Sequence, residues 1–165
     1  MGQTIETKAN EAILANDAKA IAALIKDYPD SVNMSMVNGS TNPLCRAVFN
    51  GRKEIVQILL DGGADFNQPS SEGRTPLIWS VIRVNAHLVD LLMERGADPS
   101  IRDNDGFNAL DVAIWKINYE LAMVFWKAGL RPTLDKRVYI QKAFREFDYD
   151  LFVEMLEVGR PAPER

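Results

Sequence analysis

The sequence has few of the residues on which catalytic and metal sites are commonly built. It contains one cysteine, Cys45, and one histidine, His87, among 165 residues. A lone cysteine cannot form an internal disulfide and favours a reducing compartment, so we expect a cytoplasmic protein, with a nuclear or secreted-effector location as the alternative. No nucleophile, metal-ligand or phosphate-loop pattern accompanies either residue. We therefore predict no enzymatic activity, no cofactor and no metal.

Long apolar runs and an excess of basic charge are also absent. No apolar stretch approaches the about 20 residues of a membrane helix, and the first residues lack the features of a secretory signal. Nineteen basic and 23 acidic residues give a net charge of −4, which does not favour nucleic acid. We expect neither a membrane nor a nucleic-acid partner. The apolar content of 47% is enough for one folded domain and excludes a disordered chain.

A 33-residue repeat dominates the sequence. Residues of one type recur at this interval, as in the series Gly63, Gly96, Gly129 and the series Leu44, Leu77, Leu110. A regular period of this length is typical of stacked repeat architectures.

Each repeat has the pattern of two short helices and a turn. Thr75 and Pro76 provide an N-cap and a first-turn proline. Leu77, Ser80 and Val81 then lie on one helix face. Gly96 has the position of a left-handed C-terminal cap after a second helix. Two such helices cannot bury their apolar faces alone, so neighbouring units must stack.

This pattern resembles the ankyrin-repeat family, whose unit carries Thr-Pro-Leu-His-x-Ala and ends in Leu-Leu-x-x-Gly-Ala-Asp. The resemblance is strong over residues 38–133 and implies an all-α solenoid of helix-turn-helix units with hairpin-like turns. The motif histidine is replaced in all three copies, by Cys45, Ile78 and Asp111. The glycine between the helices is kept only at Gly51; Val84 and Ile117 replace it.

We expect one ankyrin-repeat domain over residues 1–165. Its predicted parts are an N-terminal capping helix pair and loop (1–37), repeats at 38–70, 71–103 and 104–133, a C-terminal capping helix pair (134–158) and a tail (159–165). The first pair is predicted at 8–16 and 18–26. Segment 30–42 is longer than a usual connection and is predicted to be a loop.

The candidate binding residues lie opposite the predicted core on the first helix of each unit. The helical step of about 100° places residues 79, 82 and 83 opposite Leu77, Ser80 and Val81. Equivalent positions give an exposed face made of Arg46, Phe49, Asn50, Trp79, Ile82, Arg83, Val112, Trp115 and Lys116. Within it, Phe49, Ile82 and Trp115 recur every 33 residues and form one stripe, with Trp79 beside it. Exposed apolar patches and aromatic residues beside arginine mark binding surfaces. The alternative is that Trp79 and Trp115 pack between helices as part of the core.

The family resemblance implies that this face is the concave surface that holds partner proteins. It adds the turn tips, here Ser71, Glu72, Arg74, Asn104, Asp105 and Phe107. We therefore expect a protein-binding module that is monomeric when free and acts as an adaptor, inhibitor or immunity-type regulator of another protein. A self-associating structural solenoid and a bacterial effector acting on a host protein remain alternatives.

Overall fold

The computed structural model describes residues 4–36 and 39–132. Within them the chain forms eight α-helices, one short 3-10 helix and no named strand. The elements are α1 (Ile5–Ala15), α2 (Ala18–Asp27), η1 (Pro29–Asn33), α3 (Pro43–Phe49), α4 (Lys53–Asp61), α5 (Pro76–Ile82), α6 (Ala86–Glu94), α7 (Ala109–Trp115) and α8 (Tyr119–Lys127). The predicted all-α repeat solenoid is confirmed. The C-terminal helix pair and tail predicted at 134–165 lie outside the described residues.

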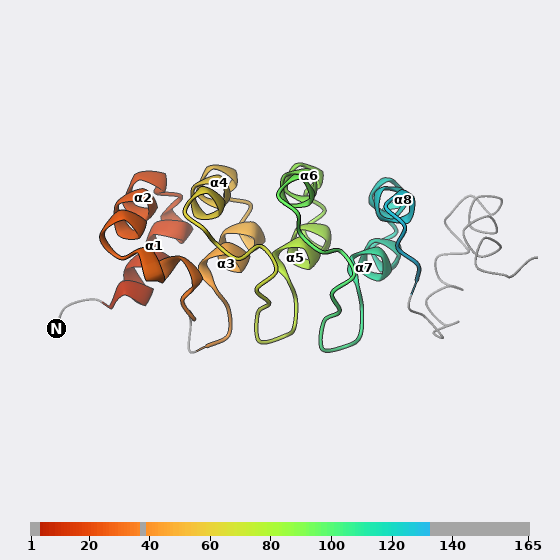
Figure 1. Cartoon of the computed structure of the whole chain (residues 1–165), viewed down its shortest axis with the longest axis horizontal. Helices are drawn as coiled ribbons and strands as arrows, with labels where there is room; N and C mark the ends of the chain where they lie inside the picture. Colours follow the sequence, from red (N-terminus) through yellow and green to blue (C-terminus); the bar gives the residue numbers. More distant parts are fainter. Residues whose placement is uncertain (1–3, 37–38, 133–165) are drawn as a thin grey trace, which may run out of the picture.

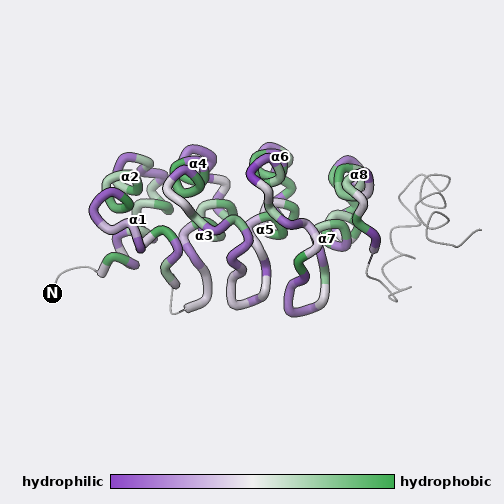
Figure 2. The backbone as a smooth tube through the Cα atoms, in the orientation of Figure 1, coloured by the Kyte–Doolittle hydropathy of each residue, from purple (hydrophilic) through white to green (hydrophobic). Residues whose placement is uncertain are grey.

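The helices form two rows (Figure 1). The inner row contains α1, α3, α5 and α7, and the outer row contains α2, α4, α6 and α8. The loops that lead into α5 and α7 project beyond the inner row. Apolar residues gather where the rows meet, and hydrophilic residues cover much of the outer row and the loop tips (Figure 2). The solenoid thus has one continuous core and an inner surface beside the loops.

The predicted helix starts and core positions are confirmed. Thr75 Oγ1 accepts a hydrogen bond from the Ile78 amide at 3.2 Å, as an N-cap does. Leu77, Ser80 and Val81 are each 1% exposed or less. Gly96 has a φ of 93°, the left-handed conformation that ends a helix and that glycine adopts without strain.

The N-terminal unit differs from its prediction in two ways. Helix α1 begins at Ile5, three residues earlier than predicted, because the Thr4 hydroxyl caps it by accepting from the Thr7 amide. Segment 30–42 is not a plain loop. It opens with η1, and the Met36 amide then donates to the Thr41 carbonyl oxygen at 2.8 Å in an isolated antiparallel bridge.

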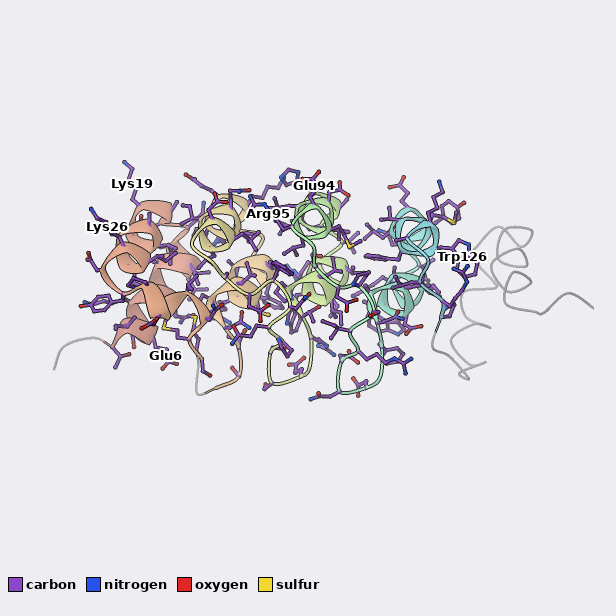
Figure 3. The ribbon with its side chains drawn as sticks, in the orientation of Figure 1. Glu6, Lys19, Lys26, Glu94, Arg95 and Trp126 are labelled. Carbon is purple, nitrogen blue, oxygen red and sulfur yellow. The ribbon has the colours of Figure 1, made fainter. Side chains whose placement is uncertain are left out.

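Polar side chains join successive repeats. Asn33 Nδ2 donates to the Gly63 carbonyl oxygen, and Asn67 Oδ1 accepts from the Asp98 amide at 2.9 Å. In the outer row, Arg95 reaches back to Asp61, with 3.1 Å between guanidinium nitrogen and carboxylate oxygen (Figure 3 labels Arg95). These bonds fix the register of one repeat on the next.

The bend between the two helices of each repeat uses left-handed backbone. Gly51, Val84 and Ile117 have φ values of 67°, 53° and 57°. The left-handed turn lets the following amide bond back into the first helix, as when the Asn85 amide donates to the Ser80 carbonyl oxygen. Glycine takes this conformation freely, whereas a β-branched residue is strained in it. Two of the three bends therefore store backbone strain.

Candidate partner-binding surface

Two hairpin-like turns hold the tips beside the inner row. In the turn over residues 70–74, the Ser70 amide donates to the Arg74 carbonyl oxygen at 2.9 Å. In the turn over residues 103–107, the Asp103 amide donates to the Phe107 carbonyl oxygen at 2.9 Å. Both turns include a glycine of positive φ, Gly73 or Gly106. The predicted hairpin geometry is therefore present in both repeats.

The first turn packs directly on the second. Asn104 donates twice across the junction, from its amide to the Glu72 carbonyl oxygen at 3.0 Å and from Nδ2 to the Ser71 carbonyl oxygen at 2.8 Å. A Cβ added to Gly73 would lie 2.7 Å from the Asn104 amide nitrogen. Only a residue without a side chain fits this approach, so the tips are held rigidly together.

Arg74 connects the two turns electrostatically. Its guanidinium pairs with Glu72 within its own turn and lies 3.5 Å from Asp103 and 4.0 Å from Asp105 of the next turn. The contact to Asp103 is ionic without hydrogen-bond geometry, because the buried Nε has no hydrogen-bond partner in the described residues. The guanidinium carbon also lies 5.0 Å from the centre of the Trp79 ring. Arg74 is thus held from several sides at the rim of the surface.

A first recess lies between α3 and α5, with a volume of about 200 Å³. Phe49 and Trp79 meet in it edge to face, with ring centres 5.1 Å apart. Trp79 is half-buried, and its Nε1 donates to Ser70 Oγ at 3.4 Å. Because Trp79 packs against its neighbours on several sides, the prediction that it is a solvent-facing member of the exposed face is only half right.

A second recess lies between α5 and α7, with a volume of about 220 Å³. It is below the about 300–1,000 Å³ of small-molecule pockets, which suits one bulky side chain better than a cofactor. Its floor and walls are largely apolar, and carboxylates and a guanidinium stand at the turn side. The lining residues are Arg74, Ile82, Asp103, Asp105, Phe107, Val112 and Trp115.

Trp115 is the most exposed aromatic ring on this surface, at 51%, followed by Phe49 at 38%. The predicted exposure of Trp115 is correct. Val112 is 5% exposed, so its placement on the solvent face was wrong. Val112 follows the buried Asp111, whose carboxylate accepts a hydrogen bond from the Asn108 amide in a capping box. All residues of α7 from Ala109 to Ile114 are buried, so Val112 is packed in the core with them. The second recess therefore offers a ring to solvent above a buried valine.

Cations lie on the aromatic rings. The Arg83 guanidinium is 5.0 Å from the centre of the Phe49 ring, and Lys116 Nζ is 4.8 Å from that of Trp115. Such contacts contribute about 0.5–1 kcal/mol at exposed sites. Arg46 Nε donates to Asn10 Oδ1 at 3.1 Å. Within residues 4–36 and 39–132, none of these three cations has a carboxylate within ion-pair distance.

All ten predicted binding residues therefore belong to one surface, which we call the inner face. Five line the second recess, three line the first, and Arg83 and Lys116 stack on rings of the two recesses. Its members are Arg46, Phe49, Arg74, Trp79, Ile82, Arg83, Asp105, Phe107, Trp115 and Lys116. The sequence pattern does not indicate the recesses themselves, nor that Asp103 lines the second recess and pairs with Arg74.

The remaining candidates for chemistry are isolated. His87 is exposed at the start of α6. Cys45 is fully buried, and burial raises the pKa of its thiol from 9.0 to about 12, which leaves it protonated and unreactive near neutral pH. The described residues contain no cluster of three His, Cys, Asp or Glu side chains able to hold a metal.

The length of the helices bears on membrane insertion. The longest helix in the part of the chain that the structure describes has 11 residues. None of those helices combines the length and apolar character needed to cross a bilayer.

Comparison with known proteins agrees with the architecture. Residues 44–134 match the ankyrin-repeat family in three copies. Comparison with curated proteins gives no significant match. The family match covers more than half of the sequence and includes α4 to α8 and all of α3 except Pro43. The 33-residue period, the paired helix rows and the family match agree, and the chain belongs to the ankyrin-repeat family.

Proposed function

We propose that this chain is a non-enzymatic protein-binding module that holds another protein against its inner face, as an adaptor, inhibitor or immunity-type regulator. Ankyrin repeats are generally protein–protein interaction modules without catalytic function. The observation that carries the proposal is Trp115, an exposed indole beside an apolar recess. Exposed aromatic residues next to a pocket, with cations around them, have the composition of a binding hot spot.

The surroundings of Trp115 support this use of the ring. Ile82 and Phe107 line the recess beside it, and the turn that carries Phe107 is held by hydrogen bonds to the preceding turn. A rigid apolar surface loses little conformational entropy when a partner binds, so more of the contact energy appears as affinity. The inner face therefore has both the chemistry and the rigidity of a docking site.

The test is capture of a partner from a lysate of the source cell by wild-type protein and by Trp115→Ala. We expect one protein in stoichiometric amount with the wild type and at least about tenfold less with the variant, since truncating a hot-spot residue costs about 2 kcal/mol or more. Tyr28→Ala is the matched control, because Tyr28 is 48% exposed but lies at the end of α2. Equal capture by all three proteins would contradict the proposal.

A further inference from the structure

In the three repeats, the exposed carboxylates of the helices lie on the outer helices and not on the inner ones. The sequences of α3, α5 and α7 contain one carboxylate, Asp111, and it is 1% exposed. The outer helices α4, α6 and α8 instead carry exposed carboxylates, namely Glu54, Asp61, Asp90, Glu94 and Glu120. Helices α3, α5 and α7 thus present cations without exposed carboxylates, although the chain as a whole has a net charge of −4.

The cations of the inner row follow one edge of the recesses. Arg83 and Lys116 are the C-cap residues of α5 and α7, 33 positions apart, so they occupy equivalent places on adjacent helices. Each lies against an aromatic ring and has no ion pair in the described residues. A cation held on a ring keeps its charge available to an incoming carboxylate.

The opposite edge of the second recess has the other sign. There Glu72 and Asp103 both pair with the guanidinium of Arg74. Two carboxylates around one guanidinium leave this turn edge negative. The apolar residues Ile82, Phe107 and Trp115 lie in the recess between the two edges. The inner face is therefore basic along the helix ends, apolar in the middle and acidic along the turns.

We propose that the inner face takes a partner segment in which a bulky apolar side chain is flanked by carboxylates. The apolar side chain enters the second recess, and the carboxylates pair with Arg83 and Lys116. This inference rests on the proposed function and names the chemistry of the partner at the same site. Adjacent helices are about 8–10 Å apart, which is about three residues of extended chain. Arg83 lies on Phe49 of α3, whereas Lys116 lies on Trp115 of α7. The two cations are therefore separated by one to two such spacings, and the paired carboxylates lie about three to six positions apart in the segment.

The charge pattern favours a peptide over a nucleic acid. Single-stranded nucleic acid also uses cations beside aromatic rings, but its phosphates form an unbroken series of negative charges. Such a strand would meet the carboxylates of the turn edge at most positions. A peptide instead places its carboxylates only where the cations are, so the mixed edges of the inner face match it better.

The experiment uses the full chain and a phage-displayed library of random peptides of about twelve residues, long enough in extended form to span several repeats. We expect enriched peptides to carry a large apolar residue with carboxylates about three to six positions apart. Their affinity is expected to fall at least about fivefold in Arg83→Gln/Lys116→Gln. Their affinity for the wild-type protein is also expected to fall as KCl rises from about 50 to about 300 mM.

The matched control is Lys19→Gln/Lys26→Gln, which removes the same two charges from exposed positions on α2 (Figure 3). We expect less than about twofold loss of affinity in this variant, because its charges lie away from the recess. Equal losses in the two double variants would show a bulk-charge effect and overturn the proposal. Only variants whose urea unfolding midpoint equals that of the wild type are compared, so that differences in folding do not contribute to the measured affinities.

The other outcomes separate this inference from the proposed function. Enriched peptides that need Trp115 but lack carboxylates overturn the acidic-segment inference and leave the protein-binding function standing. Peptides that bind every variant equally, Trp115→Ala included, count against both. A library that yields no peptide dependent on the inner face overturns the inference, while the capture experiment still tests the function. A labelled oligothymidylate that binds more tightly than the enriched peptides, and loses this binding in Arg83→Gln/Lys116→Gln, would overturn the inference. The ligand of the inner face would then be single-stranded nucleic acid.

Discussion

Trp79 and Trp115 lie on consecutive inner helices but have different surroundings. Trp79 is in the middle of α5, where it packs on Phe49 and Arg74 and donates to Ser70. Trp115 is the last residue of α7 and is half exposed beside the second recess. The residue equivalent to Trp79 in the next repeat is Val112, so Trp115 lies about one helical turn later in its repeat than Trp79 does. The comparison shows that a tryptophan in the middle of an inner helix packs between repeats, whereas one at the end is left half exposed.

The two turns beside these helices also differ in how closely they pack against neighbouring residues. Gly73 is pressed against the backbone of the next turn, whereas a Cβ at Gly106 would meet no described atom within 4 Å. Both glycines have positive φ, so both avoid conformational strain, but only Gly73 also avoids a collision. The equivalent glycines of the second and third repeats are therefore required for different reasons, conformation and close packing at Gly73 but conformation alone at Gly106.

The largest contrast is expected between Gly73→Ala and Gly106→Ala. The first variant should lose about 3 kcal/mol of unfolding free energy, from left-handed strain of about 1–2 kcal/mol and overpacking of similar size. The second should lose only the strain, about 1 kcal/mol. Urea unfolding followed by circular dichroism measures both. Equal losses would mean that the turns do not pack as closely as the structure places them.

Truncating the two tryptophans sharpens the comparison. Trp79→Ala should cost about 2 kcal/mol of stability, less than the about 3–5 kcal/mol of a fully buried aromatic residue because the ring is half exposed. Trp115→Ala should change stability by no more than about 0.5 kcal/mol. The urea midpoints of the two variants decide this. A larger loss for Trp115→Ala than for Trp79→Ala would assign Trp115 to the core and remove it from the inner face.

The bends between the helices offer a gain in stability. Val84→Asn and Ile117→Asn should each stabilise the fold by about 1 kcal/mol, because asparagine tolerates the left-handed conformation that strains a β-branched residue. Gly51→Val should lose a similar amount for the reverse reason. Thermal unfolding of the three variants provides the measurement. An unchanged midpoint in both asparagine variants would show that neighbouring contacts already offset the strain.

The smallest effect concerns the position shared by Cys45, Ile78 and Asp111. Below about pH 9 the Cys45 thiol is protonated in the folded and unfolded states and makes no pH-dependent contribution. Between its ordinary pKa of 9.0 and its folded pKa of about 12, only the unfolded state ionises, so stability falls as pH rises. We expect about 1 kcal/mol of loss between about pH 8 and pH 10.

Cys45→Ala is the control for this effect, because it leaves all other titrating groups in place. The difference between the two proteins in urea midpoint at high and neutral pH isolates the thiol. If both proteins lose equal stability over that range, the thiol is accessible to solvent in the folded state.

Local residue chemistry made much of the fold predictable. Thr75 and Pro76 specify the start of α5, and Gly96 specifies the left-handed backbone after α6. Both occur as predicted. These signals depend on residues close in sequence, so no knowledge of packing is needed. The start of α1 was missed because its cap is Thr4, and the cap's bond to the Thr7 amide has no strong signature in the sequence.

The inner face was harder to predict, because it depends on which neighbours each side chain meets. The helical step placed Trp115 and Val112 on the same side, yet only Trp115 is exposed. The stacking of Arg83 on Phe49 joins residues of different repeats, and the two recesses arise between helices rather than along one. Spacing along the chain predicts the direction of a side chain, whereas its exposure is decided by packing across the repeat junction.

The bonds between repeats also bear on how the chain folds as it is made. The hydrogen bond from Asn42 to the Gln68 carbonyl oxygen joins residues 26 positions apart in the sequence. The bonds between Asn33 and Gly63 and between Asn67 and Asp98 join residues 30 and 31 positions apart. Contacts of this range need only about one repeat of further synthesis, and such local topologies fold rapidly. At translation rates of about 5–20 residues per second, each repeat docks within seconds of its predecessor. The second recess is therefore completed only when α7 has been synthesised, after the packing around Trp79 is already in place.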